Sequence, residues 1–556
     1  MKKLLLAAFC AASLFTKAQE TPIGYAMSQA EIDQLHVVEL NHLNPAEMIR
    51  EAEEDDKLGR MSMYGRIIDL NVTPENYGVW KALPNGDMIW QLRFRVPSAQ
   101  AVSVIFNDLY LPEGSKMYLY SADRSYFEGP YDFKENNASG IYRTAEVFGD
   151  EAVLEYYQPA SVVGTAHLGI RGFVHFFRFI YDSREDRGGV GTSEACEIDV
   201  KCPEGLDWAD QRQSVVRLSL VAGNGVGLCT GSLVNNTSGD CTNYILTAMH
   251  CTIDSDAADL LASTVRFNFQ RANCGSGSAT QTQQKVGLIL HADSNDGGGS
   301  TGSDFALVEM DDAIPSSWNP YYAGWNAGTT APTADSENHK GFCIHHPSGD
   351  AKKFSTAGTV TSGTWGAANQ HWRVNWVETE TNWGVTEGGS SGSPLYNKDR
   401  QIIGTLTGGG SFCDAPTSSD FYGKMDKHWT GNPNPANEDL VDWLDAAGTG
   451  WISMNGAYVG SGNTPCMPIA STEELTFEDV KVFPSFASDV VNISGNAELI
   501  DATVKIFDAS GKLISSFLML KETSTIDVTS WENGVYFISF QAGDRGFVTQ
   551  KITIVH

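Results

Sequence analysis

The sequence predicts a mainly β protein built from several domains, and three observations lead to this prediction. Apolar and polar residues alternate with a period of two over many short segments, such as 90–96 and 503–508, between Gly-rich turns. Helical character is confined to two short stretches, residues 46–57 and 437–444. The chain has 556 residues, which corresponds to about three or four domains at ~150 residues each.

Composition excludes some classes of protein. Hydrophobic residues make up 42% and aromatic residues 10% of the chain, which is enough for packed cores and argues against a disordered polymer. The 38 Lys and Arg residues face 68 Asp and Glu residues, so the formal net charge is −30. Nucleic-acid binding needs clustered cations and is therefore excluded as a function, whereas an acidic surface attracts basic substrates.

The first residues have the pattern of a secretory signal peptide. Two lysines at positions 2 and 3 precede an uncharged apolar run, residues 4–15, and Ala18 offers a small residue for cleavage. The run is shorter than the ~20 residues of a membrane-spanning helix. We therefore interpret residues 1–18 as a cleaved signal peptide. We expect a secreted protein, extracellular or on the cell surface, that passes through the periplasm and has no stable membrane span.

The cysteines indicate disulfides in one part of the chain. Ten are present, and nine remain once Cys10 leaves with the signal peptide. Eight of the nine lie between Cys196 and Cys413, and an exported protein favours disulfides over buried thiols at such positions. The histidines lack the spacing of zinc ligands, so we expect no metal. Because nine is an odd number, at least one thiol is free or bonds to another chain.

The alternation and the turns divide the chain further. Residues 19–187 read as a β-rich domain that resembles a β-sandwich, and a polar, Gly-rich stretch around residues 183–192 marks its end. Residues 188–457 contain many short strands with Gly-rich turns, as in a pair of β-barrels. A linker follows over 458–470, and residues 471–556 read as a small β-sandwich.

Three local patterns in the predicted barrels carry possible chemistry. His250 ends an apolar strand, Asp304 precedes another, and Ser391 lies in a Gly/Ser-rich loop. Each alone is more often structural: a strand-end His, a turn Asp and an ordinary loop. Together they meet the demands of nucleophilic catalysis, because a Ser hydroxyl needs an imidazole to take its proton and the imidazole needs a carboxylate to orient it. Glycines let backbone N–H groups converge on an oxyanion.

The motifs around these residues resemble those of trypsin-like serine proteases. The sequence has TAMHC at 247–251, DFAL at 304–307 and GSSGSP at 389–394, in the order His, Asp, Ser. Further segments are similar to the bacterial lysyl endopeptidase group: CEIDVKCPEG at 196–205, CTGSLVNNT at 229–237, IHHPSGDAKK at 344–353, GVTEGGSSGSP at 384–394 and DWLDAAGTG at 442–450.

The resemblance implies a chymotrypsin-like double β-barrel protease domain that needs no cofactor. It makes His250 the general base and acid, Asp304 its orienting carboxylate and Ser391 the nucleophile, with the N–H groups of Gly389 and Ser391 as the oxyanion hole. It also implies three disulfides, Cys196–Cys413, Cys202–Cys274 and Cys229–Cys251. Two further cysteines, Cys241 and Cys343, could pair with each other.

Substrate choice depends on one carboxylate. Val385 occupies the position at which typical trypsins carry the Asp that binds a basic P1 side chain. Lysyl endopeptidases resemble this sequence at Asp420, and a buried carboxylate there calls for Lys, and possibly Arg, at P1. If Asp420 is only a surface turn residue, P1 is neutral. The run Thr407, Gly408 and Gly409 offers backbone for the substrate chain. Thr407 replaces a His of the best-matching enzymes, which leaves Lys-over-Arg selectivity open.

The flanking domains complete the prediction. Residues 19–187 have the place and size of a propeptide that assists folding and blocks activity, with Arg187–Gly188 as the maturation bond. Residues 471–556 resemble the C-terminal sorting domain of type IX secretion, through segments such as 480–493 and 533–536, and imply that machinery as a partner. A generic sandwich that binds ligands is the alternative for this domain. For the whole chain, the alternative is an inactive protease-like protein that binds partners at the cell surface.

Overall fold

The computed structural model describes residues 20–162, 164–179, 191–280, 282–432, 438–458, 480–495, 503–509, 512–519, 521, 523–541 and 547–556. It divides into two compact units, residues 1–466 and 467–556. The predicted signal peptide, the bond 187–188, Cys466 and nearly all of the predicted linker lie outside the described residues. Within these described ranges no helix has the length and apolar character that crossing a bilayer requires.

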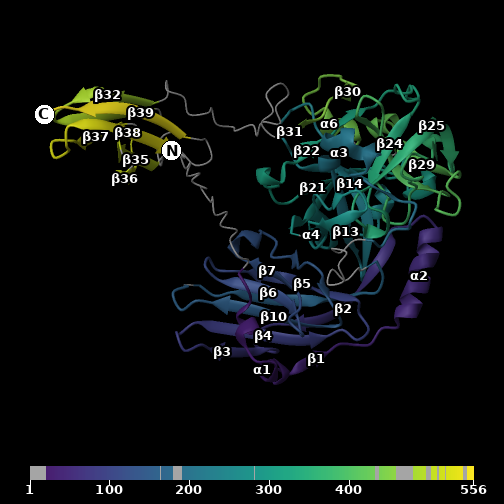
Figure 1. Cartoon of the computed structure of the whole chain (residues 1–556), viewed down its shortest axis with the longest axis horizontal. Helices are drawn as coiled ribbons and strands as arrows, with labels where there is room; N and C mark the ends of the chain where they lie inside the picture. Colours follow the sequence, from purple (N-terminus) through teal and green to yellow (C-terminus); the bar gives the residue numbers. More distant parts are fainter. Residues whose placement is uncertain are drawn as a thin grey trace, which may run out of the picture. The chain divides into compact units, whose positions relative to one another are not determined.

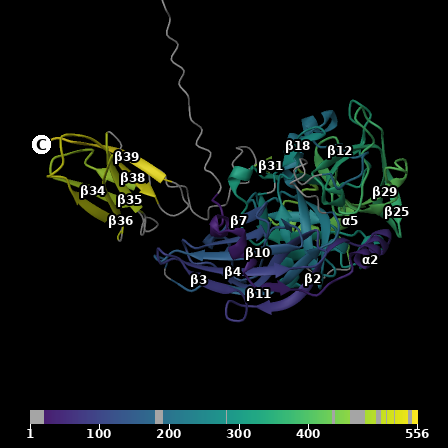
Figure 2. The ribbon, with the colours of Figure 1, turned by 60° about the horizontal axis from the view of Figure 1, so that its bottom comes forward.

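The N-terminal domain, residues 20–179, is a β-sandwich with one prominent helix (Figures 1 and 2). This helix, α2, begins after Asn44, whose side chain accepts a hydrogen bond from the N–H of Ala46, and has Pro45 in its first turn. The helices are η1 (Ile23–Ala26), α1 (Gln29–Asp33), α2 (Pro45–Lys57) and η2 (Phe133–Glu135). The strands are β1 (Val37–Glu39), β2 (Ser62–Val72), β3 (Val79–Ala82), β4 (Met88–Arg95), β5 (Ala101–Tyr110), β6 (Lys116–Ser121), β7 (Phe127–Tyr131), β8 (Tyr142–Arg143), β9 (Val147–Phe148), β10 (Glu151–Gln158) and β11 (His167–Phe176).

Two layers enclose the core of this domain. One sheet runs in the order β1-β4-β10-β6-β7, with β3 against β4 (Figure 1). The other contains β2, β11, β5 and β8. Their apolar faces meet in one cluster, to which β4 contributes Trp90 and Leu92 and β5 contributes Val104 and Phe106, all fully buried. The alternation of apolar residues along these strands therefore gives the sandwich that the sequence predicts.

The middle domain, residues 191–458, consists of two β-barrels, as predicted. Its helices are η3 (Pro203–Trp208), α3 (Ala209–Ser214), η4 (Met249–Cys251), α4 (Ala257–Leu261), η5 (Gly299–Thr301), η6 (Ser316–Trp318), η7 (Pro347–Gly349), α5 (Met425–Trp429) and α6 (Leu440–Leu444). Its strands are β12 (Ile198–Asp199), β13 (Val215–Ala222), β14 (Gly225–Leu233), β15 (Tyr244–Thr247), β16 (Thr264–Arg266), β17 (Arg271–Asn273), β18 (Ser276–Ala279), β19 (Gln284–Val286), β20 (Leu288–Asp293), β21 (Ala306–Met310), β22 (Tyr321–Tyr322), β23 (Gly324–Asn326), β24 (Gly341–His345), β25 (Lys353–Trp365), β26 (Ala367–Trp376), β27 (Pro394–Tyr396), β28 (Gln401–Gly409), β29 (Ser419–Lys424), β30 (Ser453–Met454) and β31 (Ala457–Tyr458).

The second barrel closes on itself, because β24, β25, β26, β29, β28 and β27 pair in turn and β27 pairs back with β24. The first barrel follows the order β19-β16-β13-β14-β15-β21-β20 and is nearly closed. The predicted helix at 437–444 is shorter in the structure. Asp439 has extended backbone and α6 begins only at Leu440; residues 433–437 lie outside the described part.

The two domains of this unit share one sheet. Strand β2 of the N-terminal domain pairs antiparallel with the first half of β14, and β15 takes the second half of the same edge. Behind this junction, Glu146 lies 2.7 Å from Arg266 and 3.7 Å from Arg217, and all three side chains are nearly buried. Burial alone would raise the pKa of Glu146, but the neighbouring guanidinium groups outweigh it and the pKa falls below its usual range.

The second unit is a small β-sandwich. Its strands are β32 (Val480–Phe483), β33 (Phe486–Ala487), β34 (Val490–Gly495), β35 (Thr503–Asp508), β36 (Leu513–Leu518), β37 (Thr523–Asp527), β38 (Gly534–Gln541) and β39 (Phe547–Ile554). They form one sheet in the order β32-β34-β37 and another in the order β33-β39-β38-β35-β36. Val491, Val504 and Ile538 meet in its buried core. The predicted sandwich is therefore present.

Three disulfides join the pairs that the family resemblance implies: Cys196–Cys413, Cys202–Cys274 and Cys229–Cys251. The possible bond between Cys241 and Cys343 is not formed. Cys343 lies buried in the core of the second barrel, and its thiol donates a hydrogen bond to Ser393 at 3.3 Å. Cys241 packs against the core of the first barrel, a different cluster. The positions of the two cysteines in the sequence did not indicate that they belong to different barrels.

Candidate active site

Strand pairing brings His250 and Asp304 together. Strands β15 and β21 run antiparallel, and their last pair is Thr247 with Ala306. Asp304 lies just before β21 and His250 just after β15, so the two residues emerge at the same end of the ladder. The His250 Nδ1 lies 2.7 Å from one Asp304 oxygen, and the His250 backbone N–H donates to the other at 2.9 Å.

Asp304 is held in an unusual backbone conformation and is wholly buried. Its φ is +61°, in the left-handed region that residues other than glycine seldom adopt. Burial alone would raise the pKa of this carboxyl group, but the positive charge and hydrogen bonds of His250, with a backbone N–H from Gly299, outweigh it and lower the pKa. The site is thus arranged to hold an ionised carboxylate against an imidazole.

Ser391 lies in the loop between residues 384 and 393, which two glycines shape. Gly389 and Gly392 have φ of +93° and +78°. A Cβ on Gly392 would lie 2.1 Å from Thr247 Oγ1, and one on Gly389 would lie 3.0 Å from the His346 carbonyl oxygen. No larger residue fits this turn without displacing its neighbours. A turn shaped by glycines allows backbone N–H groups to converge on one point, as the predicted oxyanion hole of Gly389 and Ser391 requires.

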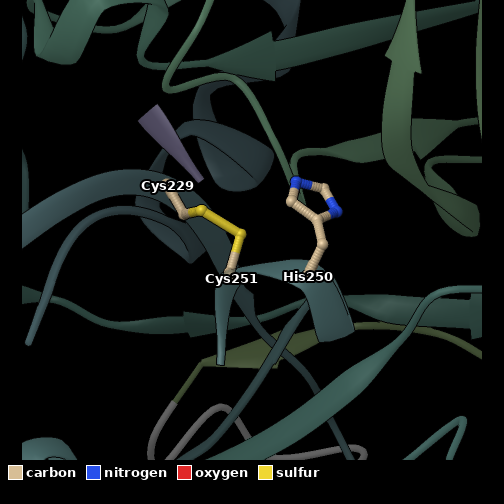
Figure 3. Close-up of side chains that lie close together, drawn as sticks. All are labelled: Cys229, His250 and Cys251. Atoms are coloured by element: carbon tan, nitrogen blue, oxygen red, sulfur yellow. A yellow bond between two sulfur atoms is a disulfide. The ribbon is translucent and has the colours of Figure 1, made fainter. Parts of the chain in front are cut away.

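The imidazole of His250 is not hydrogen-bonded to Ser391 in this structure. Its Nε2 is buried and has no hydrogen-bond partner within the described residues. The Cys229–Cys251 disulfide lies directly beside it and ties η4 to β14 (Figure 3). Nucleophile–base hydrogen bonds are often long or absent before substrate binds, so the separation is compatible with catalysis.

Ser391 lines a cavity of about 440 Å³. On one side its walls come from the middle domain: Gly299, Ser300, Trp365, Thr386, Glu387, Gly388, Ser391, Leu406, Thr407, Gly408, Gly409, Ser411 and Phe412. On the other side they come from the N-terminal domain: Glu53, Asp56, Lys57, Leu58, Gly59 and Arg60. The end of α2 and the turn after it therefore form part of the cleft that contains the nucleophile.

The N-terminal wall is held by one bidentate ion pair. Arg178 donates to the two carboxylate oxygens of Asp56 at 2.8 and 3.1 Å and also donates to Ser62 Oγ. Ser62 lies close enough to Gly388 that a Cβ on this glycine would be 2.8 Å from its hydroxyl oxygen. The N-terminal domain thus reaches the nucleophile loop itself.

Asp420 lies directly behind this cavity. It is on β29, paired with Gly409 of β28, and its side chain is fully buried. Its carboxylate accepts hydrogen bonds from Trp376 Nε1 at 2.6 Å, Thr386 Oγ1 at 2.8 Å, and Ser411 through both Oγ (2.5 Å) and N (3.1 Å). Thr386 and Ser411 line the cavity, whereas Asp420 stands immediately behind them.

The donors around Asp420 are neutral. Burial raises the pKa of this carboxyl group, and the hydrogen bonds from Ser411, Trp376 and Thr386 offset only part of the rise. A surface turn is therefore excluded as the role of Asp420. A buried carboxylate without a cationic partner among its donors is electrostatically unbalanced when it is ionised.

The run Thr407–Gly409 forms part of the cavity wall, as its predicted role requires. Thr407 is nearly buried, and its hydroxyl lies 3.2 Å from Nε2 of His371 on β26. Burial lowers the pKa of His371 to about 4. The similar enzymes carry a histidine at the position of Thr407. In this protein a histidine from another strand, His371, contacts the Thr407 side chain instead.

Sequence reasoning missed several residues of the site. Trp376, Thr386 and Ser411 hold Asp420, and Trp365 lines the cavity, yet none belongs to the catalytic motifs. For Thr386, the available signal in the sequence was a hydroxyl-bearing residue within the Gly384–Pro394 loop, close to the nucleophile. The other three depend on which strands of the second barrel become neighbours, and local sequence does not contain that information.

Two groups of His, Cys and carboxylate side chains lie close together in the described ranges: Cys229, His250 and Cys251, and Glu194, Glu387 and Cys413. The sulfur atoms in both groups belong to disulfides. A disulfide sulfur is not a thiolate ligand, so neither group offers the donor set of a structural zinc site.

Comparisons with known proteins agree with this architecture. Residues 190–423 match the family described as "Lysyl endopeptidase, C-terminal domain", and residues 481–555 match the "Secretion system C-terminal sorting domain". The chain is 30% identical over 335 residues to a lysyl endopeptidase of Pseudomonas aeruginosa, an alignment that covers 56% of this chain and 67% of that protein.

Solved structures with weaker similarity include a protease from M. tuberculosis in its active form, with 16% identity over 42% of this chain and 85% of that one, at a TM-score of 0.28. A Glu endopeptidase in complex with MPD has 19% identity over 43% of this chain and 93% of that one, at a TM-score of 0.25.

Proposed function

This chain belongs to the lysyl endopeptidase family and is a secreted serine endopeptidase with a type IX C-terminal sorting domain; from this premise we propose that it cleaves peptide bonds after Lys, and also after Arg, with His250, Asp304 and Ser391 as its catalytic triad. The observation that carries the proposal is the contact of His250 with buried Asp304 beside a cavity that Ser391 lines.

In the proposed reaction Ser391 Oγ bonds to the carbonyl carbon of the substrate while His250 Nε2 takes its proton. The carbonyl oxygen becomes an oxyanion, which the N–H groups of Gly389 and Ser391 stabilise. His250 then gives the proton to the leaving amine as the C–N bond breaks, and an acyl-enzyme remains. A water molecule attacks the ester in the same way and releases the acid and Ser391. Asp304 keeps its charge and orients the imidazole throughout.

The P1 preference rests on Asp420. The ammonium group of a P1 Lys would lie against Ser411 and Thr386, with the Asp420 charge directly behind them. The low dielectric of the site makes an unpaired carboxylate costly, so substrates that bring a cation are favoured. The alternative, a neutral P1 preference, would hold if Asp420 serves only to fix these two side chains.

We propose further that residues 19–187 are a propeptide, residues 188–457 the mature protease and residues 471–556 the domain that the type IX machinery recognises. The N-terminal wall of the cleft supports an inhibitory role, because Leu58–Arg60 stand where a substrate chain would enter. Pairing of β2 with β14 supports a folding role, since it completes the edge of the first barrel.

The decisive experiment uses peptides that differ only at P1, with Lys, Arg, Phe or Glu, and the matured protein. Cleavage after Lys is expected, and Ser391→Ala should lower kcat by about 10⁶-fold. Turnover of the Phe or Glu peptides in preference to Lys would leave the triad and overturn the pocket. A mature protein that cleaves none of the four peptides would favour an inactive binding scaffold.

The propeptide is tested separately with a reagent that acylates an active-site serine. Labelling of Ser391 should be slow in the uncleaved chain and fast after maturation, and Arg178→Ala should accelerate labelling of the uncleaved chain because it releases Asp56. Equal labelling rates before and after maturation would contradict an inhibitory role. Arg95→Ala serves as the matched control, because it removes another arginine–carboxylate ion pair of the N-terminal domain, the exposed pair with Asp150, at a residue that does not line the cavity.

A further inference from the structure

A second polar cluster lies behind the nucleophile loop, outside the triad. Its centre is Glu197, whose side chain is fully buried. Within the described residues neither oxygen of Glu197 has a hydrogen-bond donor. The Nε2 of His345 lies 3.7 Å from Glu197, and Glu387 of the nucleophile loop also interacts with the Glu197 carboxyl group. A buried carboxyl group without donors is costly when ionised.

The carboxyl group of Glu387 offers Glu197 a hydrogen-bond partner. Two carboxylates repel each other and have no proton for a hydrogen bond, whereas a carboxyl group and a carboxylate bond strongly. Glu387 already accepts from Ser348 Oγ at 2.7 Å and from the N–H of Glu194 at 2.9 Å, which suits an ionised partner. The proton then resides mainly on Glu197, the more buried of the two.

The cluster is connected to the residue before the nucleophile. His345 lies between Ser390 and Ser355, with its Nδ1 2.8 Å from Ser390 Oγ and its Nε2 2.9 Å from Ser355 Oγ. Ser390 Oγ also accepts from the N–H of Glu387 at 3.2 Å. Movement of Glu387 would therefore be felt at Ser390 and at the backbone N–H groups that follow it.

Glu197 comes from the segment that follows the proposed maturation bond. In this segment, residues 191–197, the N–H of Gly191 and the hydroxyl of Ser193 donate to Asp350, and the N–H of Glu194 donates to Glu387. The Cys196–Cys413 disulfide fixes its end. The segment is thus attached to the support of the nucleophile loop along its length.

Among the described residues, the cation that acts on Glu197 is Lys353, and its effect on the pKa of Glu197 is smaller than that of burial. Lys353 is 2.6 Å from Asp199 and 3.4 Å from Asp350, so its charge is already shared by two carboxylates. Burial, with a smaller contribution from Lys353, lowers the pKa of His345 to about 3, so this imidazole is neutral at pH 7. Of the other titratable neighbours, Asp350 and the exposed Glu194 add negative charge, and burial raises the pKa of the Cys343 thiol to about 12, so it is neutral.

We propose that Glu197 is a positioning residue for the nucleophile loop, and that one proton shared between Glu197 and Glu387 keeps this loop in its active conformation. The inference rests on the proposed function, since it concerns the loop that contains Ser391. Loss of the shared proton at alkaline pH places two negative charges side by side and displaces Glu387, and with it Ser390 and the oxyanion-binding N–H groups.

The direction of the pH effect follows from burial. Burial, the charge of Glu387 and the contact with it raise the pKa of Glu197 well above its ordinary value of 4.5, and burial also raises the pKa of Glu387. A raised pKa in the folded state means that stability present at low pH is lost as the pH rises through the folded value. Activity therefore declines on the alkaline side of the profile.

The test compares kcat and KM between pH 5 and 10 for the matured wild type, Glu197→Gln and Glu197→Ala, with a Lys peptide. The amide of Glu197→Gln donates to Glu387 at every pH, so the alkaline limb of its kcat profile should move upward by at least one pH unit. Glu197→Ala should lower kcat about 10-fold or more with little change in KM. Glu380→Gln, an exposed glutamate of the same domain, is the control and should follow the wild type.

An alkaline limb of Glu197→Gln that superimposes on the wild type would overturn the proposal. If Glu197→Ala fails to fold, Glu197→Gln still decides. A wild type that cleaves no peptide would refute the proposed function but not the shared proton, which thermal unfolding tests without any substrate. The Tm of Glu197→Gln should rise relative to that of the wild type as the pH increases from 5 to 9. A Tm difference that is independent of pH would refute the shared proton.

Discussion

Asp304 and Asp420 are both fully buried carboxyl groups in the same domain, yet their environments drive their pKa values in opposite directions. Asp304 stands beside His250, and the pKa of Asp304 falls although burial opposes this. Asp420 accepts four hydrogen bonds from Trp376, Thr386 and Ser411, all neutral donors, and burial raises its pKa.

The difference shows what each site lacks. Asp304 has His250 as a potential cation within the protein, and in the proposed mechanism this cation forms when the imidazole takes a proton. Among the described residues Asp420 has neutral hydrogen-bond donors and no cationic one, and Thr386 and Ser411, which donate to it, line the cavity that Ser391 also lines. We therefore propose that Asp304 acts in the reaction and Asp420 in the choice of substrate. Exchange of the carboxylate for an amide at each position separates the two roles.

The largest effect is expected from Asp304→Asn. The amide cannot hold the imidazole in the correct tautomer, so kcat for a Lys peptide should drop by about 10⁴-fold with little change in KM. Steady-state kinetics of the matured variant measures this. The preference of this variant among P1 residues should stay as in the wild type. A loss in kcat of less than 10-fold would show that another group orients His250.

Asp420→Asn should act on specificity. Asn keeps the size of the side chain and one accepting oxygen but loses the charge, so it should lower kcat/KM for the Lys peptide by about 100-fold or more, because a desolvated ammonium loses its counter-charge. Turnover of a Phe peptide should change little or rise. If the Lys and Phe peptides lose activity equally, Asp420 only supports the fold of the pocket.

Thr407→His should have a smaller effect. We expect the wild type to cleave Arg and Lys peptides with kcat/KM values within about 10-fold of each other. A tenfold ratio corresponds to a difference of ~1.4 kcal/mol in activation free energy. A larger side chain at position 407 narrows the cavity wall and should shift this ratio toward Lys. Thr407→Ser keeps the small hydroxyl that faces His371 and is the control. An unchanged ratio in Thr407→His would contradict a role of this wall in selectivity.

The smallest effect concerns stability. The lowered pKa of Asp304 contributes stability above its unfolded value of about 3.8, and this contribution is lost as the pH falls through the folded value. The raised pKa of Asp420 has the opposite sign, so stability is lost as the pH rises. Between pH 4 and 8, Asp420→Asn should gain Tm relative to wild type, by about 2–4 °C for each pKa unit, whereas Asp304→Asn should not. Parallel Tm curves for the two variants would contradict the comparison.

Local sequence was enough to predict the elements on which the site depends. The alternation of the strands, the TAMHC segment around His250 and the glycines beside Ser391 each reflect a local demand, and the structure places them in two barrels. Asn44 and Pro45 similarly mark the start of α2. These features require only neighbours within a few residues along the chain.

Features that depend on distant partners could not be predicted. The pairing of β2 with β14 joins strands more than 150 residues apart, and nothing in either strand specifies the other. The donors of Asp420 come from β26, the nucleophile loop and the turn after β28. Cys343 and Cys241 failed to pair for the same reason, because each belongs to a different core.

Inhibition by a small cation is the most direct test of Asp420 as the partner of a basic P1 side chain. Butylammonium has the shape of a Lys side chain end, and it should inhibit the matured protease competitively. Its Ki should fall as the pH rises through the raised pKa of Asp420, because the carboxylate must ionise to bind it. In Asp420→Asn inhibition should be weak and independent of pH. Equal Ki values for wild type and Asp420→Asn at every pH would contradict the assignment of Asp420 as the partner of a basic P1 residue.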